Sequence, residues 1–290
     1  MGFASDLNQD GFVLLTEVDP PKGIDLTKFT DSVTAIKGRV TAVAVTDGAN
    51  AIMRMTHLAP CRMLIDNNIE PVMILNGRDR NRISFQGDML AAWSLGVRTI
   101  IFKQGQDPAI GDQPMAESSG DLNIDVMLEC AAALNNGHDL GGEKLDGKTD
   151  FLIGAHLEVS DDINVNRKNA GSVAKLAKAG IDFAVLGPTY DTNIVDLFAE
   201  ATADAGIKLL SSIMLLKSVA MIRYLNNLPS VPNVPHEFLK QMMKSPVKQK
   251  AGMQIAASYI NDIQDRCKGA VLLALGWGDQ MPEFLDLLGR

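Results

Sequence analysis

Residues 12–23 read FVLLTEVDPPKG, an apolar run that ends in a carboxylate and passes directly into a turn. Phe12–Glu17 has the length and apolar content of a buried strand, and the two prolines and the glycine after it favour a change of direction. Similar short apolar runs recur along the chain. They are 41–45, 71–75, 98–102, 151–155, 183–186, 208–213 and 270–274. This recurrence predicts about eight strands.

Longer segments with helical periodicity separate the strands. We predict helices near 27–37, 51–67, 82–95, 122–135, 166–179, 192–205, 217–227 and 247–266, and a last one after Pro282. Asp191 is placed to cap the helix after the sixth strand, and Gly96, Gly180 and Gly206 stand where helices should end. Strands that alternate with helices over this length predict an α/β fold, a single (β/α)8 TIM barrel that occupies residues 1–290 as one domain. A doubly wound open sheet is the alternative, although no GxGxxG motif follows the first strand.

Composition excludes several classes of function. The 290 residues are 46% hydrophobic and carry a formal net charge of −8, with no Lys/Arg-rich block, so we expect no nucleic-acid partner. No apolar run approaches the roughly 20 residues that cross a bilayer, and residues 1–11 lack the pattern of a secretory signal. Cys61, Cys130 and Cys267 have no metal-ligand spacing, which predicts buried free thiols, no metal and a cytoplasmic protein.

In a barrel of this class, function concentrates in the loops that follow the strands. Glu17 ends the first strand and is the strongest candidate for acid–base chemistry, because burial at the barrel opening can raise the pKa of a carboxyl group. The alternative is a carboxylate that accepts hydrogen bonds from loop amides or pairs with Lys22. Asp47 and Asn50, after the second strand, either contact a ligand or cap the next helix, and we favour the cap.

Three further loops contain polar candidates. Residues 78–81 (RDRN) either grip an anion or form internal ion pairs that hold the start of the next helix, and we favour the ion pairs. Gly105 and Gln106 either approach a ligand or make a tight turn. His156 is the one histidine at a predicted strand end, where a structural role is more common than that of a catalytic base. These residues predict a small-molecule enzyme or binding protein.

Seven segments at or near these loops resemble a known family. They are 17–23 (EVDPPKG), 45–50 (VTDGAN), 78–81 (RDRN), 86–98, 105–111, 134–143 and 225–229 (LNNLP). Together they resemble methylenetetrahydrofolate reductase, and most closely the short bacterial form that also occurs fused behind a homocysteine methyltransferase domain. The resemblance implies an oxidoreductase acting on a CH–NH group, which reduces 5,10-methylenetetrahydrofolate to 5-methyltetrahydrofolate, or catalyses the reverse oxidation, on a barrel that binds FAD at the carboxyl ends of its strands.

The resemblance also implies roles for individual residues. Glu17 matches the general acid that protonates N10 of the folate. The implied flavin contacts are Thr46, Asp47, Ala49, Asn76, Gly105, Gln106, Asp107, His156 and Lys175, the last an approximate match to a basic residue near the flavin phosphates. The implied folate contacts are Glu17, Gln106, Gly187 and Tyr190.

The chain departs from the family pattern inside this pocket. A His-Leu-Thr-Cys-like segment is replaced by Ile74–Gly77, and Gln106 stands where a carboxylate usually faces the flavin, which favours flavin reduction. The usual Thr-Gln-Pro after the sixth strand is Leu186-Gly187-Pro188. The departures point to a changed ligand set or electron donor.

We therefore keep three readings of the function. The leading one is a flavin-dependent reductase with a folate substrate, in which NAD(P)H or an electron-donor protein supplies the electrons. The first alternative is a flavin-free family member that binds tetrahydrofolate or takes part in methyl transfer, and the second is a non-catalytic subunit of a larger complex. The sequence leaves open whether the chain forms a homo-oligomer.

Overall fold

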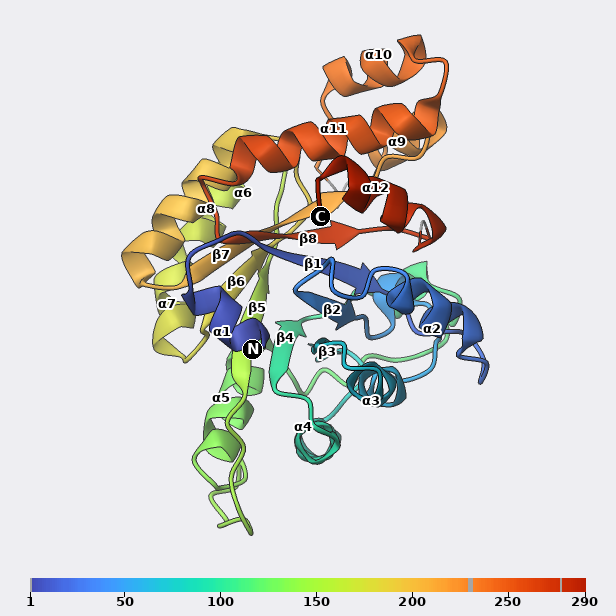
Figure 1. Cartoon of the computed structure of the whole chain (residues 1–290). Coiled ribbons are helices and arrows are strands. Elements are labelled where there is room, and N and C mark those ends of the chain that lie inside the picture. The colour runs from blue at the N-terminus through green and yellow to red at the C-terminus, as the bar shows by residue number, and fades with distance from the viewer. Residues whose placement is uncertain (1, 229–231, 277) are drawn as a thin grey trace.

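Eight parallel strands close into a barrel in the computed structural model, which describes residues 2–228, 232–276 and 278–290. Each strand pairs with the next along the chain, and the last pairs with the first, with Val13 opposite Gly269. The strands are β1 Val13–Val18, β2 Ala42–Val45, β3 Pro71–Asn76, β4 Thr99–Lys103, β5 Leu152–Leu157, β6 Phe183–Leu186, β7 Lys208–Met214 and β8 Gly269–Leu273. The predicted (β/α)8 barrel is confirmed and the open sheet is excluded (Figure 1).

Alternate residues of each strand face opposite sides of the barrel wall. One buried apolar cluster fills the barrel interior and includes Leu15, Ala44, Ile74, Ile101 and Val185. The residues between them, such as Leu14, Val45 and Phe102, belong to a larger cluster that packs against the surrounding helices. This parity identifies which side chains at the strand ends face the interior.

Helix α1 (Phe3–Asn8) closes the amino end of the barrel. Phe3 and Leu7 are buried in the interior cluster, and the ring of Phe3 meets that of Phe183 edge-on at 5.4 Å between centroids. This helix lies outside the segments with a helical pattern in the sequence. Its apolar side chains seal one end of the barrel, so the other end is the one left for ligands.

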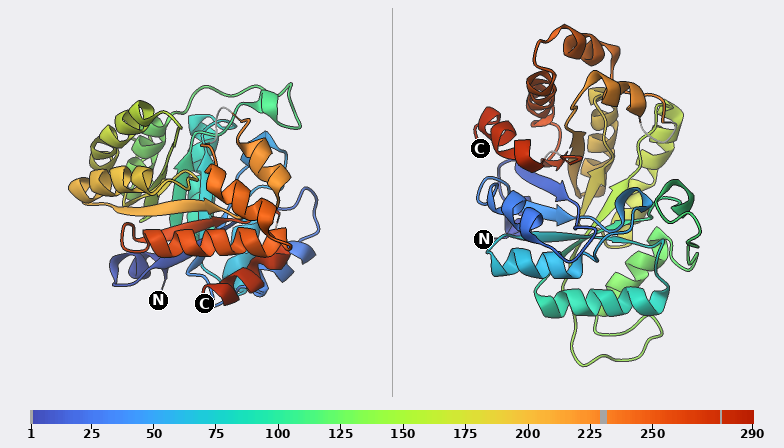
Figure 2. Two further views of the ribbon diagram at one scale, coloured as in Figure 1. Left: turned by 90° about the horizontal axis from the view of Figure 1, so that it is seen from above. Right: turned by 90° about the vertical axis from the view of Figure 1, so that its right-hand side faces the viewer.

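The remaining helices surround the strands (Figures 1 and 2). They are α2 Thr27–Thr34, α3 Leu58–Asp66, α4 Arg82–Leu95, α5 Ile124–Asn135, α6 Ile163–Gly171, α7 Val173–Lys178, α8 Thr192–Ala205, α9 Val219–Leu225, α10 His236–Lys244, α11 Lys248–Ile263 and α12 Met281–Leu287. Three short 3-10 turns complete the set, η1 Ala49–Ala51, η2 Pro108–Ile110 and η3 Gly278–Gln280. The Asp191 side chain caps α8 as predicted, and Gly96 and Gly206 end α4 and α8 in the left-handed conformation.

Three helix predictions need correction. The helix predicted over 51–67 begins only at Leu58, because Asn50 and Ala51 take positive φ angles of 57° and 55° and the backbone then runs as a loop. The helix predicted over 166–179 is two helices, α6 and α7, which join at Ser172. Helix α10 was not predicted, and it projects from the layer of helices beside α11 (Figure 1).

Candidate functional site

Polar side chains end several interior-facing columns of the strands: Asn76 ends that of β3, and three others carry a titratable group. Glu17 continues the column of Val13 and Leu15, while Lys103 and His156 occupy the corresponding interior positions of β4 and β5. The register that pairs Phe102 with Ala155 places Lys103 beside His156. Because β1 lies opposite β5 in an eight-stranded barrel, Glu17 faces these two residues across the interior. We call this trio, Glu17, Lys103 and His156, the mouth cluster.

The surroundings of His156 favour its neutral form. Burial lowers the pKa of its imidazole, as does the nearby charge of Lys103, while Glu158 and Glu17 act in the opposite direction. Its Nδ1 lies 3.3 Å from Oε1 of Glu158, an ion-pair distance without hydrogen-bond geometry, so this buried nitrogen has no hydrogen-bond partner within the described part of the chain. A β-carbon at Gly187 would lie 3.5 Å from Cε1 of His156, which places Gly187 directly against the imidazole.

Lys103 was missed by the sequence analysis. The predicted strand stopped at Phe102, one residue before it, although the alternation with Ile101 would have turned its side chain inward. Among the residues that the structure describes, Lys103 forms neither a side-chain hydrogen bond nor an ion pair. An ammonium group without a partner at the end of a barrel strand is available to a ligand.

Asp47 belongs to a buried network rather than to an open loop. Its Oδ2 accepts hydrogen bonds from Nδ2 of Asn76 at 2.7 Å and from Arg80 at 2.6 Å, and its Oδ1 lies 3.4 Å from Nδ1 of His57. Burial opposes ionisation, but His57, Arg80 and the backbone amide of Asn76 outweigh it and hold the pKa of Asp47 at about 2. The predicted capping role of Asp47 is wrong. Its carboxylate and backbone carbonyl instead accept hydrogen bonds from Asn76.

The RDRN segment makes internal ion pairs, as favoured from the sequence. Arg78 pairs with Asp79 at 2.5 Å, and Arg80 pairs with both Asp47 and Asp88. Asn81 caps α4 by accepting hydrogen bonds from two backbone amides. These contacts fix the conformation of the loop after β3.

Gly105 and Gln106 join neighbouring loops. Gly105 has a φ of +87°, and a β-carbon there would come within 2.8 Å of Cβ of Arg78, so the position requires glycine. The Gln106 side chain accepts from the amide of Asn50 at 2.7 Å and donates to its side chain at 3.2 Å. Asp107 caps η2. These contacts link the loop after β4 to the loop after β2.

Thr46 and Ala49 lie on the second of these loops. The Thr46 hydroxyl donates to Asp19 at 2.6 Å, and Asp19 in turn pairs with Arg54 at 3.2 Å. Ala49 begins the turn η1, which packs against η2. The structure thus brings Thr46, Asp47, Ala49, Asn76, Gly105, Gln106 and Asp107 into one connected set of loops beside the mouth cluster.

Two predicted site residues lie elsewhere. Tyr190 is buried among the rings of Phe238 and Tyr259, and its hydroxyl donates to the carbonyl of Met214, so its polar atom is already bonded. Lys175 lies on α7 in the outer layer and pairs with Asp125 at 2.7 Å. Neither side chain joins the mouth cluster.

Exposed apolar side chains surround the opening. Ile24, Met53, Ile110, Met115 and Leu275 follow β1, β2, β4 and β8 on their loops, and Ile24 and Met115 are each more than 90% exposed. A few polar groups inside an apolar rim are typical of sites that bind small molecules.

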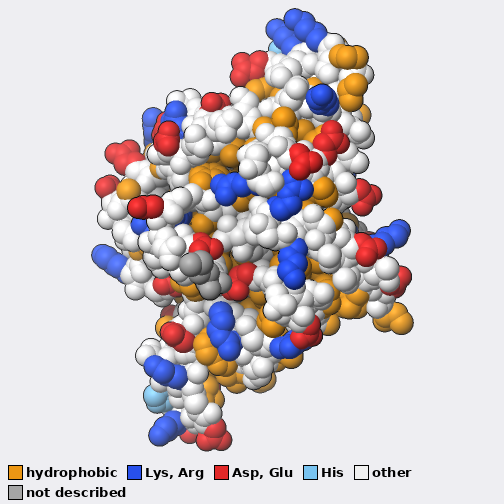
Figure 3. Space-filling view, in the orientation of Figure 1, with side chains coloured by type: hydrophobic (Ala, Val, Ile, Leu, Met, Phe, Trp, Pro, Cys, Tyr) orange, Lys and Arg blue, Asp and Glu red, His pale blue; other side chains and the backbone are white. Residues whose placement is uncertain are grey.

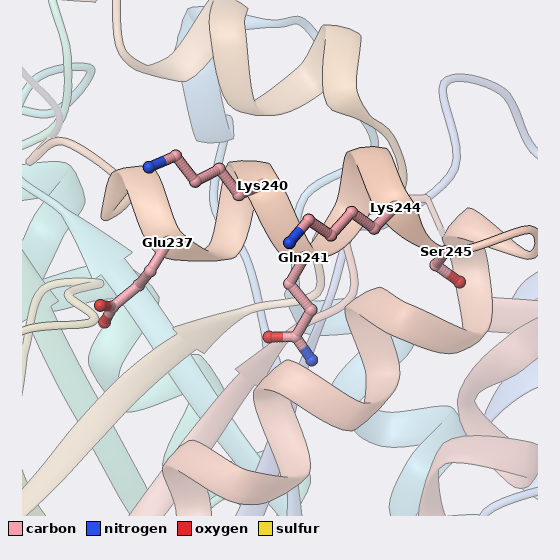
Figure 4. Close-up of a pocket in the computed structure, with 5 residues that line it drawn as sticks. All are labelled: Glu237, Lys240, Gln241, Lys244 and Ser245. Carbon is pink, nitrogen blue, oxygen red and sulfur yellow. The ribbon is translucent and has the colours of Figure 1, made fainter.

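A surface hollow away from the barrel opening is lined by side chains that are not buried. It has a volume of about 480 Å³, lies along α10 and is lined by Glu237, Lys240, Gln241, Lys244 and Ser245 (Figure 4). None of these side chains is buried, and the lysine amines point along the open surface. On the face shown in Figure 3, basic and acidic side chains are interspersed rather than gathered into one patch.

The described residues were also compared with the requirements of a metal site and of a membrane-spanning helix. No group of three His, Cys, Asp or Glu side chains there could hold a metal ion. No described helix is both long and apolar enough to cross a membrane. All three cysteines are free thiols, and burial raises the pKa of Cys61 to about 12.

Comparisons with known proteins identify one family. The model of the methylenetetrahydrofolate reductase family matches residues 3–286, nearly the whole chain. A search of curated proteins found no match. A crystal structure of 2,3-dimethylmalate lyase, a PEP mutase/isocitrate lyase superfamily member, is similar with a TM-score of 0.50 and 13% identity, over 99% of this chain and 86% of that chain. At that identity the likeness concerns the fold alone.

Proposed function

Because the chain belongs to the methylenetetrahydrofolate reductase family, we propose that it interconverts 5,10-methylenetetrahydrofolate and 5-methyltetrahydrofolate at the carboxyl end of its barrel. The family supports folate one-carbon reduction in general. The specific proposal adds a bound flavin as hydride carrier and Glu17 as the proton donor. The observation that carries it is the mouth cluster, which presents a carboxyl group opposite a cation and a neutral imidazole.

Glu17 has the position that a general acid needs. It ends an interior-facing column, and the residues that the structure describes leave its carboxyl group without a hydrogen bond or an ion pair. A carboxyl group that makes no hydrogen bond within the protein can donate its proton to a ligand, here to N10 of the folate. Protonation of N10 opens the five-membered ring and prepares the one-carbon unit to accept a hydride. The lowered pKa of His156, which faces Glu17 across the interior, favours the uncharged imidazole.

A flavin ring fits the groups around the opening. Among the described residues, the buried Nδ1 of His156 has no hydrogen-bond partner and Lys103 has no ion pair, and the rim is apolar. We propose that the loops containing Thr46, Ala49, Gly105 and Gln106 hold the ring, which would supply hydride chemistry when bound. Lys175 is a weaker candidate for the flavin phosphates, because it is paired on the outer helices.

One set of contacts favours a second function. Asp47, Asn76 and Asp107 are all engaged within the protein, and Tyr190 is buried. A family member that binds tetrahydrofolate without a flavin would not need these side chains to contact a ligand. We keep this flavin-free role as the alternative.

A spectroscopic experiment separates the two. The full chain is reconstituted with FAD, bleached anaerobically with a reductant and mixed with 5,10-methylenetetrahydrofolate. Recovery of the flavin absorbance supports the reductase. A colourless protein that binds 5-methyltetrahydrofolate in calorimetry supports the alternative, and a protein that takes up neither ligand contradicts both.

The role of Glu17 is tested in the same reaction. We expect Glu17→Gln to slow flavin reoxidation by the folate about 10²- to 10⁴-fold while flavin uptake is retained. Glu158→Gln is the matched control, since Glu158 carries the same charge at the same opening but is largely exposed. Equal losses in both variants would contradict a specific acid role for Glu17.

A further inference from the structure

Lys103 is the feature of the mouth cluster that the proposed function does not use. It faces the interior at the end of β4, beside His156 and opposite Glu17. Its charge is strong enough to influence both His156 and Glu158, yet it forms no ion pair with either within the described ranges. A half-buried ammonium group without a partner in the described ranges keeps its donors available for a charged ligand group.

The surroundings of Lys103 indicate the kind of ligand group it would bind. The interior position beside it on β3 is Asn76, whose amide is already bonded to Asp47. The other interior positions, including Ile74, Val185 and Gly187, are apolar or small. The charge of Lys103 acts on Glu158, which lies at the solvent edge, and Glu17, across the interior, is assigned to the substrate. Negative charge on a ligand seated between these walls would be the best partner for the ammonium group.

We propose that Lys103 holds negative charge on the ring system bound in the mouth, and so stabilises a flavin there in its reduced, anionic form. This inference rests on the proposed function. A flavin that accepts a hydride gains two electrons and one proton, and without a second proton its ring carries a negative charge. A cation beside that ring favours the reduced state.

The consequence concerns the direction of the reaction. A flavin that is easier to reduce is a better hydride acceptor and a poorer hydride donor. Lys103 therefore shifts the balance toward withdrawal of a hydride from 5-methyltetrahydrofolate, with methylenetetrahydrofolate as product and an external acceptor to reoxidise the flavin.

The test is a redox titration of the flavin-loaded full chain, followed by absorbance against a dye of known potential. We expect Lys103→Met to shift the equilibrium at least tenfold toward oxidised flavin, which is about 30 mV for a two-electron couple. Lys103→Arg, which restores the charge, should recover most of the shift. Lys178→Met is the matched control, because Lys178 is an exposed lysine on α7 and its loss changes the net charge equally.

The possible outcomes are distinct. An unchanged potential in Lys103→Met, or an equal shift in Lys178→Met, overturns the role of Lys103 and leaves the reductase proposal standing. Failure of the wild-type chain to take up FAD overturns both. A loss of affinity for tetrahydrofolate but not for tetrahydropteroate, which lacks the glutamate tail, would assign Lys103 to the tail carboxylates and overturn its role at the ring. Circular dichroism establishes that each variant is folded, and Lys103→Gln replaces Lys103→Met if the latter is not.

Discussion

The buried carboxylate of Asp47 provides the sharpest prediction for stability. Replacing Asp47 with Asn keeps the shape of the side chain but removes the charge that faces Arg80 and His57. The pKa of Asp47 falls from 3.8 to about 2 in the folded protein, and this difference corresponds to about 2.5 kcal/mol at neutral pH. We therefore expect Asp47→Asn to lower the free energy of unfolding by about 2 to 4 kcal/mol, the upper value including the cost of leaving Arg80 partly unpaired.

The sign of the pH dependence follows from the lowered pKa. The stabilisation is complete above pH 3.8, where the unfolded carboxyl group is also ionised, and it is lost as the pH falls toward 2. The difference between wild type and Asp47→Asn should be about half as large at pH 3 as at pH 7.

Urea unfolding followed by circular dichroism at both pH values measures this difference. Asp121→Asn is the control, because Asp121 pairs with Arg82 at 2.7 Å on the surface, where an ion pair contributes little. The reasoning would be refuted if Asp47→Asn were as stable as wild type at pH 7, or if its deficit were the same at pH 3.

Three further predictions concern single positions. Because burial lowers the pKa of His156 below its ordinary value of 6.5, the unfolded state binds a proton more readily, and stability should decline as the pH falls below 6.5. Melting curves measured across this range should show a weaker decline in His156→Gln. Equal slopes in the two proteins would contradict the lowered pKa of His156. Gly105→Ala should destabilise the fold by about 1 to 3 kcal/mol more than Gly142→Ala, since both positions have positive φ but only Gly105 lacks room for a methyl group; equal losses in urea unfolding would argue against the steric cause. Cys61 and Cys130, whose thiol pKa values burial raises to about 12 and 11, should react with a thiol reagent at pH 8 only after unfolding, and fast labelling of the native protein would show that they are accessible.

The strands were predictable because each is a short apolar run that the barrel buries on both faces. All eight lie within one to two residues of their predicted bounds. The helices before β3 and β6 were less accurate, because positive φ angles at Asn50 and Ala51 and the junction at Ser172 leave no periodic signal. Helix α1 was missed because its few apolar residues have meaning only against the interior that they cover.

The sequence predicts where the candidate residues lie along the strands, but not which side chains they contact. Strand ends identified Glu17 and His156 correctly as neighbours of the opening. The role of Asp47 depended on Arg80 and His57, which approach it only after the loops fold, so sequence spacing could not distinguish a cap from a buried ion pair. Lys103 was not predicted as a site residue, because the predicted strand ends at Phe102, one residue before it.

The seal formed by Phe3 and Leu7 has a kinetic consequence. With the amino end closed and the interior filled with side chains, every molecule that reacts at the mouth cluster must enter and leave through the same opening. A donor and an acceptor that need the same face of a bound ring would then exclude each other and react in turn. Steady-state rates measured against both concentrations should give parallel rather than intersecting double-reciprocal lines.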